Sequence, residues 1–221
     1  EICFTDHLDY TPEMDMVFDM AAYNAEYDRL EVPGLLIRRG VEFGLTPDNA
    51  EQLKIDLNRR HFDFVLGSIH LVDGADVYMA PYWADKTYDE AIRRDLETTL
   101  ACVRAHEDYD VLGHLTYICK CGANPRKELL RYEDHKSILD EILTELVKRE
   151  KGMELNTSGI DRCGGSLPTL DYFQRFQELG GRIVTVGSDA HDTARAGQYT
   201  HEMVAELKKI FGYVCTFEDR R

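Results

Sequence analysis

The sequence predicts an α/β fold, a single domain with a parallel sheet and helices outside it. Short apolar runs alternate with longer amphipathic stretches over all 221 residues, which is typical of strand–helix units. The repeating unit averages roughly 30 residues, close to that of a (β/α) barrel. The chain contains no glycine-rich nucleotide motif that would favour the alternative, an open doubly wound sheet.

Seven apolar runs are the predicted strands, because strands buried on both faces appear as short continuous apolar segments. They are residues 2–5, 35–37, 64–66, 110–112, 153–155, 183–186 and 213–217. Since a helix-length stretch separates most of them, we expect neighbouring strands to be parallel.

The amphipathic stretches carry start and stop signals for helices. Thr11-Pro12 and Thr46-Pro47 each place an N-cap residue before a proline at the first helical position. Thr87 and Glu90 form a capping box at the start of another helix. Three later helices, with apolar side chains at helical spacing, are predicted to end at glycines: Gly152, Gly180-Gly181 and Gly212.

Composition and charge exclude several classes of protein. The chain is 43% hydrophobic and 30% charged, which excludes collagen-like and disordered sequences. No apolar run approaches the length of about 18 residues that a transmembrane helix needs. With 26 basic and 41 acidic residues the net charge is −15, so we expect neither long nucleic acid nor a membrane as a partner. A small phosphorylated metabolite fits if the site holds positive charge of its own.

Cysteine usage indicates a reducing compartment. Six cysteines, at positions 3, 102, 119, 121, 163 and 215, are scattered along the chain. A chain of this length needs no disulfides for stability, and no signal-peptide pattern precedes them, so we expect reduced thiols and a cytoplasmic location. The Cys119-Lys120-Cys121 pair lacks zinc-finger spacing. Nothing in the sequence indicates the oligomeric state.

Metal-competent side chains follow five of the predicted strands. In chain order these are His7, Glu42, His70, His114 and the pair Asp189 and His191. The carboxyl ends of parallel strands converge on one face of a barrel, so we expect these side chains to meet. Imidazole and carboxylate ligands without thiolate suit Zn, Mn or Fe, and paired metals about 3.5–4 Å apart can clamp a phosphoryl group. The sequence therefore predicts a shared polynuclear metal centre.

Each of these residues also has a purely structural interpretation. A single histidine near a strand end is often a core or surface residue, Glu42 can form a salt bridge, and Asp189 can cap a helix. The joint pattern favours the metal centre, because the other histidines lie in helices or loops away from strand ends. These are His61, His106, His135 and His201.

The motifs resemble those of the PHP (polymerase and histidinol phosphatase) family, and within it the histidinol-phosphatase branch. The matching segments are Thr5-Asp6-His7, Gly40-Val41-Glu42, Gly67-Ser68-Ile69-His70, Gly113-His114, Asn156-Thr157-Ser158-Gly159 and Gly187-Ser188-Asp189-Ala190-His191. The resemblance implies a distorted, TIM-like (β/α)7 barrel over residues 1–221. It also implies a metal-dependent hydrolysis of L-histidinol phosphate to L-histidinol and phosphate, in histidine biosynthesis.

The resemblance further implies two to three divalent transition metals (Zn, Mn or Fe) on the carboxyl-end face. By position, it assigns Glu42 as the bridge between two metals, His70 and His114 to the second metal, Asp189 to the first, and His7 and His191 to the third.

Other candidates follow from the same strand ends. Arg162, Arg195 and Lys120 each lie beyond a strand end and are expected to bind the substrate's phosphate, with a solvated surface cation as the alternative. Asp189 and His191 are the expected proton donors to the leaving oxygen, although metal ligation competes with that role.

One departure from the family pattern lies at the start of the sequence. The family opens with a strand that ends in His-x-His, and this sequence contains no His-x-His. We expect the family's first strand and helix to be missing from this chain, through truncation or disorder rather than degeneration. The alternative functions are a PHP-type nucleotide phosphatase or nuclease, a metal-dependent amidohydrolase, and a catalytically impaired barrel.

Overall fold

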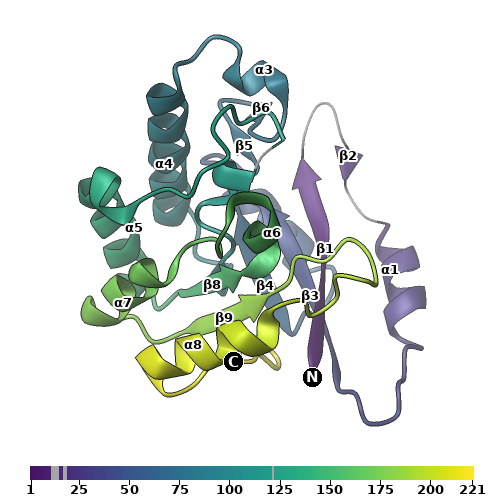
Figure 1. The fold of residues 1–221 in the computed structure, drawn as a ribbon. Coiled ribbons are helices and arrows are strands. Elements are labelled where there is room, and N and C mark those ends of the chain that lie inside the picture. The colour runs from purple at the N-terminus through teal and green to yellow at the C-terminus, as the bar shows by residue number, and fades with distance from the viewer. Residues whose placement is uncertain (11–14, 17–18, 121) are drawn as a thin grey trace.

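The computed structural model describes residues 1–10, 15–16, 19–120 and 122–221. Its main sheet has parallel strands in the order β1-β3-β4-β7-β8-β9, and the short β2 (Asp15–Met16) pairs antiparallel with the end of β1. The parallel strands are β1 (Ile2–Tyr10), β3 (Ile37–Gly44), β4 (Phe64–Ser68), β7 (Val111–Leu112), β8 (Gly152–Asn156) and β9 (Val184–Gly187). The sheet forms a half-barrel (Figure 1), and the predicted α/β fold is confirmed.

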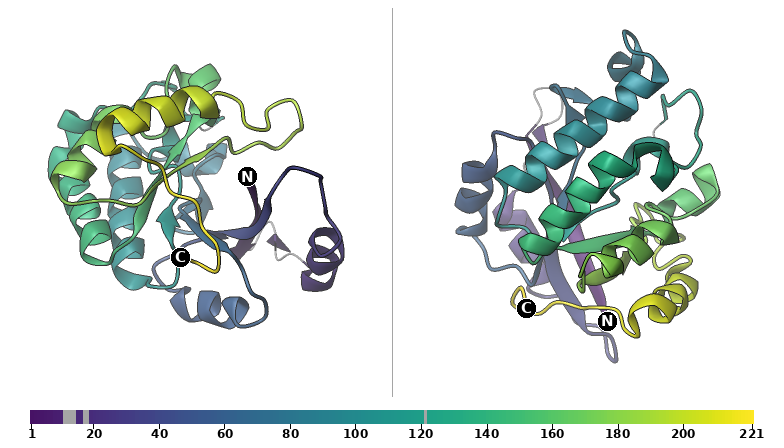
Figure 2. Two further views of the ribbon diagram at one scale, coloured as in Figure 1. Left: turned by 90° about the horizontal axis from the view of Figure 1, so that it is seen from below. Right: turned by 90° about the vertical axis from the view of Figure 1, so that its left-hand side faces the viewer.

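Helices lie outside the sheet, as the alternation predicts. The longer ones are α1 (Met20–Tyr27), α2 (Ala50–Leu57), α4 (Tyr88–Ala105), α5 (Lys136–Lys148), α7 (Leu170–Glu178) and α8 (Thr200–Phe211). Figure 2 shows α4, α5, α7 and α8 in succession along the outer face. The connections contain β5 (Leu71–Val72), β6 (Ala75–Asp76), α3 (Ala80–Trp83), α6 (Ile160–Cys163) and the 3₁₀ turns η1 (Tyr117–Lys120), η2 (Tyr132–His135) and η3 (Thr157–Gly159). None of the described helices is long and apolar enough to cross a membrane.

Several local helix signals are confirmed. Thr87 and Glu90 form the predicted capping box, with Glu90 Oε2 2.8 Å from Thr87 N and Thr87 Oγ1 3.3 Å from Glu90 N. Gly180 and Gly212 follow α7 and α8 with φ values of 101° and 84°. These left-handed values favour glycine, which explains why both helices stop there.

Other helix boundaries differ from the prediction. The Thr46-Pro47 segment is a turn before α2, held by Asn49 Oδ1, which accepts from Thr46 N at 2.9 Å. Gly152 does not end α5 but opens β8, where a Cβ atom would lie 2.6 Å from Ile183 Cγ2 and 2.7 Å from Val111 Cγ2. Close strand packing, not a helix stop, therefore requires glycine there. The predicted helix start at Thr11-Pro12 lies outside the described residues.

Two predicted strands are wrong in position or type. The run at 35–37 only touches β3, because the strand continues through Arg38 and Arg39, whose charges pair with acids at the sheet's amino end. The run at 213–217 is not a strand. It makes one backbone hydrogen bond to β9, from Cys215 N to Val184 O at 2.8 Å, and its Phe217 ring packs 4.9 Å from Phe64.

Two apolar cores support the site. The larger lies between the sheet and the outer helices, and the smaller, of Phe64, Leu66 and Val111, fills the inside of the sheet. Phe217 packs against this smaller core as the C-terminal segment crosses the end where the strands begin (Figure 2). Apolar side chains therefore close the half-barrel at the end where the strands begin, and polar side chains lie at the end where the strands finish.

The half-barrel is open between its first and last parallel strands. Among the described residues β1 pairs with β2 and β3 but not with β9. A cavity of about 530 Å³ extends between them. It is lined by residues 2–7 of β1, by Gly187 of β9 with residues 188–193 and Ala196 after it, and by Glu42, Leu66, Glu154 and Asn156 of the strands between.

Candidate metal centre

Neighbouring strands bring four of the predicted ligands together at their carboxyl ends. The parallel register sets His7 of β1 opposite Glu42 of β3. His70 and His114 each lie two residues beyond the ends of β4 and β7. Since these strands are adjacent in the sheet, the four side chains meet as their positions predict.

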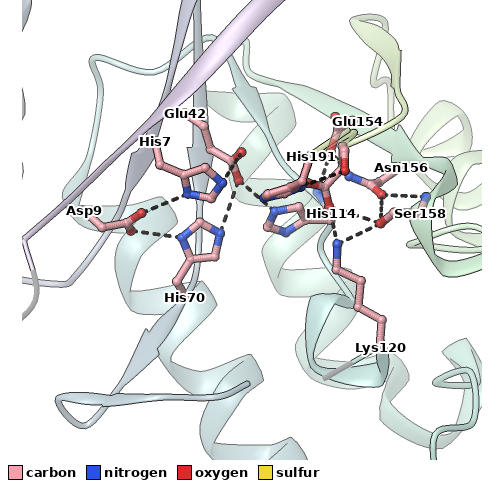
Figure 3. A network of polar contacts seen from close by, with 11 residues as sticks. His7, Asp9, Glu42, His70, His114, Lys120, Glu154, Asn156, Ser158 and His191 are labelled. Atoms are coloured by element: carbon pink, nitrogen blue, oxygen red, sulfur yellow. Dashed lines mark hydrogen bonds and ion pairs between the residues drawn. The ribbon is translucent and has the colours of Figure 1, made fainter. Parts of the chain in front are cut away.

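A buried carboxylate, Glu42, lies among the three imidazoles (Figure 3). Its Oε1 is 2.9 Å from His114 Nε2 and 3.2 Å from His70 Nε2. Its Oε2 is 3.5 Å from His7 Nε2. Both carboxylate oxygens therefore face ring nitrogens, and the same nitrogens converge on one small volume.

Electrostatics keep this carboxylate ionised. Burial acts to raise the pKa of Glu42, but hydrogen bonds from His114 and His70 and the nearby charge of His7 hold it well below its ordinary value. Burial acts to lower the pKa of His70, but hydrogen bonds to Asp9 and Glu42 raise it to about 10. The cluster is a mutually stabilised group of opposite charges.

The cluster fits a divalent transition metal. Ligand atoms of His7, Glu42 and His70 all lie within 4.8 Å of one another. The buried Nδ1 of His114 has no hydrogen-bond partner in the described part of the chain, and such an atom needs one. Three imidazoles and a carboxylate without thiolate are a donor set for Zn, Mn or Fe.

Asp9 is a residue that the sequence analysis missed. It is buried in β1, and its Oδ1 lies 2.9 Å from His70 Nδ1 while its Oδ2 lies 3.1 Å from His7 Nδ1. Hydrogen bonds from both rings outweigh burial and lower the pKa of Asp9 to about 2. A carboxylate on Nδ1 leaves Nε2 free to bind a metal. The period-2 spacing of His7 and Asp9, which puts both on one face of a strand, was the available signal.

The close approach of Asp9 depends on a glycine in the neighbouring strand. A Cβ atom at Gly44 would overlap Asp9 Oδ1. Gly44 therefore creates the space in which the carboxylate reaches both imidazoles.

Glu154 holds the backbone of His114 in place through a hydrogen bond. It is buried in β8, and its Oε2 accepts from His114 N at 3.0 Å and from Asn156 Nδ2 at 3.2 Å. Burial raises the pKa of Glu154. A Cβ atom at Gly187 would overlap its Oε1. The sequence analysis placed Glu154 within the predicted strand 153–155 and did not predict this contact.

A second cluster joins Lys120 to Asp189. The Lys120 ammonium contacts the Asp189 carboxylate. It also donates to Ser158 Oγ at 2.8 Å (Figure 3). Ser158 Oγ donates to Asn156 Oδ1 at 2.6 Å. Burial acts to raise the pKa of Asp189, but Lys120 and His114 lower it. A predicted phosphate-binding cation and a predicted metal ligand are thus directly paired.

His191 lies at the edge of the centre. Its side chain is 70% exposed, and its ring centroid is 5.7 Å from that of His7. Its Nδ1 lies 3.1 Å from Asp189 O. Tyr117, which the sequence places shortly after His114, has its ring 4.7 Å from the His114 ring and 5.3 Å from that of His70.

One cavity of about 490 Å³ collects nearly all predicted site residues. Those that line it are His7, His70, His114, Lys120, Arg162, Asp189, His191 and Arg195. Glu42 lines instead the adjoining cavity between β1 and β9. Arg162 belongs to the short helix α6 after β8, and Arg195 to the loop after β9. Arg195 pairs with Asp192 at an Nε–Oδ2 distance of 3.7 Å.

The remaining histidines lie elsewhere. None of His61, His106, His135 and His201 lines either cavity. His61 forms a separate, exposed group with Asp63 and Asp219, in which its Nε2 lies 2.6 Å from Asp219 Oδ1.

Comparisons with known proteins identify a family and its named members. The model of the PHP domain matches residues 1–158. A probable histidinol-phosphatase from Clostridium acetobutylicum is 36% identical over 192 residues, which are 86% of this chain and 74% of that protein. A histidinol-phosphatase from Lactococcus lactis is 31% identical over 223 residues, which are 98% of this chain and 82% of that protein.

A solved structure shares the fold. It is the histidinol phosphate phosphatase of Lactococcus lactis in complex with zinc, L-histidinol and phosphate. The match has a TM-score of 0.84 and 28% sequence identity, and it covers 99% of this chain and 85% of that one.

Proposed function

This chain belongs to the PHP domain family, and from that premise we propose that it hydrolyses L-histidinol phosphate to L-histidinol and phosphate in histidine biosynthesis. The observation that carries the proposal is the buried Glu42 among three strand-end imidazoles, next to a cavity lined by three cations. The relatives named histidinol-phosphatase support the same substrate.

Two to three divalent metals, Zn, Mn or Fe, are proposed as cofactors. Glu42 would hold two of them together with His70 and His114, while Asp189, His7 and His191 would supply the remaining ligands. When bound, such metals lower the pKa of water and neutralise the oxygens of a phosphoryl group. The zinc in the related Lactococcus lactis structure supports this assignment.

The chain's own cations would bind and orient the phosphate. Arg162, Arg195 and Lys120 line one cavity, and guanidinium groups suit the planar pairs of oxygens that a phosphate presents. Lys120 is buried and also contacts Ser158. A cation held in this way pays little further entropy when it binds an anion, so Lys120 would act as a preorganised contact.

Asp189 and His191 are the proposed proton donors to the leaving oxygen. The exposed ring of His191 borders the cavity, and its Nδ1 lies 3.1 Å from the backbone carbonyl oxygen of Asp189 and 3.5 Å from its carboxylate Oδ1. A carbonyl oxygen that accepts from one ring nitrogen leaves the other nitrogen free to face a substrate. His191 is the better placed of the two, because Asp189 is engaged by Lys120.

A complete (β/α)7 barrel is the proposed architecture, with one further strand between β1 and β9. The cavity of about 530 Å³ at that place supports it, and the strand would carry the His-x-His pair that this sequence lacks.

Unpaired thiols at the described cysteines support a cytoplasmic location.

A comparison of substrates tests the function. The full-length protein, supplied with zinc or manganese, is assayed with L-histidinol phosphate, a mononucleotide and a single-stranded oligonucleotide. We expect kcat/KM for L-histidinol phosphate to exceed the others at least tenfold, since a chain of charge −15 repels polyanions. A larger kcat/KM for the mononucleotide or the oligonucleotide would overturn the proposed substrate. If none of the three compounds were hydrolysed, the proposed phosphatase activity would be wrong.

A further inference from the structure

The cavity is larger than a phosphate group and a metal centre require. Its volume of about 490 Å³ is in the range that accommodates a small organic ligand. Besides the ligand cluster and the cations, its lining includes Leu71 and Asp76 in the β5–β6 hairpin and Tyr78 and Met79 just after it. This hairpin is therefore a surface that the organic part of a substrate can contact.

Four carboxylates line the cavity, namely Asp9, Asp76, Asp189 and Asp192. Three of them already face the side chain of a Lys, Arg or His residue. Asp9 is held by two imidazoles, Asp189 by Lys120, and Asp192 by Arg195. The charges of these three carboxylates are therefore balanced by side chains of the protein itself.

Asp76 differs from the other three. Within the described ranges, no Lys, Arg or His side chain forms an ion pair with it. Its Oδ1 accepts a hydrogen bond from Tyr78 N at 2.8 Å, which fixes the side chain at the turn after β6. A half-buried carboxylate with no counter-charge, on the wall of a cavity, favours a cationic ligand.

The charges of the two walls are complementary to a substrate with two unlike ends. Of the three cations that line the cavity, Lys120 and Arg195 are paired with Asp189 and Asp192, whereas Arg162 has no carboxylate partner in the described ranges and donates to Tyr78 Oη at 3.4 Å. The cavity thus offers a guanidinium that suits a phosphate and, on the hairpin beside Leu71, Tyr78 and Met79, the Asp76 carboxylate that suits a cation. Resting on the proposed function, we propose that Asp76 binds the protonated amine of the substrate and makes the site select amine-bearing phosphate monoesters.

The variant Asp76→Asn tests the proposal without disturbing the hairpin, because the amide oxygen of Asn still accepts from Tyr78 N. Kinetics are measured with L-histidinol phosphate and with 4-nitrophenyl phosphate, which has no cationic group. We expect KM for L-histidinol phosphate to rise at least tenfold with kcat within twofold. Both constants for 4-nitrophenyl phosphate should stay within twofold of the wild type.

Asp73→Asn is the matched control. Asp73 lies in the turn of the same hairpin, pairs with Arg94 at an Nε–Oδ2 distance of 3.0 Å, and does not line the cavity. Its loss removes the same charge from the same element, so both substrates should retain wild-type kinetics within twofold. An equal effect of Asp73→Asn and Asp76→Asn would show a general field effect and overturn the specific contact.

Calorimetric binding of L-histidinol separates this proposal from the proposed function. We expect the Kd for L-histidinol to rise about tenfold in Asp76→Asn, whether or not the protein hydrolyses phosphate esters. An unchanged Kd, or an equal loss of activity with both phosphate esters, would overturn the role of Asp76. If the wild-type protein hydrolysed neither ester but bound L-histidinol through Asp76, only the proposed phosphatase activity would be overturned.

Discussion

At the residue scale, Glu42 is the side chain on which the candidate centre depends most. It is buried, it is ionised, and its two oxygens face the ring nitrogens of His7, His70 and His114. A neutral amide of the same size would keep the packing but lose the charge and one of the two acceptor oxygens.

We therefore predict that Glu42→Gln lowers kcat/KM for L-histidinol phosphate by at least about a hundredfold, since even outer-sphere changes at metal sites cost about 10- to 100-fold. The control is His201→Ala on the exposed side of α8, which should change kcat/KM less than twofold. Equal damage from both variants, in proteins with native circular dichroism, would show that strand-end position does not identify the ligands.

Asp9 tests the support of the centre. Replacing it by Asn leaves one carbonyl oxygen for two Nδ1–H groups, so at least one of His7 and His70 loses its orienting partner. We predict a 10- to 100-fold weaker metal affinity for Asp9→Asn, measured by competition with a chelator of known affinity.

Asp219→Asn is the control for this measurement, because it removes a carboxylate from the exposed pair with His61. Metal affinity at the centre should not change. If Asp9→Asn bound metal as tightly as Asp219→Asn does, the contacts of Asp9 would be structural only.

At the element scale, α4 contains a buried carboxyl group whose protonation links the stability of the fold to pH. Asp95 lies on its buried face, and burial raises its pKa to about 8. In the unfolded chain this carboxyl ionises near its ordinary value of 3.8. The folded state therefore binds a proton that the unfolded state has released, and this group destabilises the fold increasingly as the pH rises from about 4 to about 8.

We predict that Asp95→Asn removes this pH dependence. The free energy of unfolding of the variant relative to the wild type should increase between pH 5 and pH 8 by an amount on the order of 3 kcal/mol, measured by urea denaturation. Glu97→Gln, on the outer side of the same helix, should show no such trend. A constant difference between Asp95→Asn and wild type would mean that Asp95 is ionised in the folded protein.

The elements also show where local patterns are sufficient. The capping box at Thr87 and the glycines after α7 and α8 acted as predicted, because each depends on residues within one turn. The predictions for β3 and for the segment 213–217 were wrong. Charged residues can occupy a strand whose end faces water, as they do in β3. An apolar segment can pack through its side chains without forming a strand, as 213–217 does.

At the scale of the whole molecule, the candidate metal centre would couple metal binding to stability. Its side chains come from β1, β3 and the segments after β4 and β7, so a metal that bound only the folded state would stabilise the whole half-barrel. At a free metal concentration of about 100 Kd, one site contributes about 2.7 kcal/mol.

We predict that zinc raises the Tm of chelator-treated protein by about 5–10 °C, the shift expected for that free energy in a chain of this size. Differential scanning calorimetry measures it, and Glu42→Gln should show a much smaller shift. Protein that was never exposed to chelator, contains no transition metal by elemental analysis and shows no response to zinc would contradict the polynuclear centre.

The sequence by itself determined the α/β class, most strand positions and the side chains offered at the strand ends. These depend on apolar period, on caps within one turn and on the convergence of parallel strands, all of which operate locally or by a general rule. His7, Glu42, His70 and His114 were accessible to this reasoning because each lies two to five residues beyond the end of an apolar run.

Only the tertiary structure decided which groups support those side chains. Asp9 meets His70 across 61 residues, Glu154 meets His114 across 40, and Lys120 meets Asp189 across 69. These contacts depend on strand register and on close approaches at Gly44 and Gly187, which no local pattern specifies. The cavity wall with the uncompensated Asp76 likewise exists only once the β5–β6 hairpin has packed over the strand ends, because charge balance is a property of the assembled site.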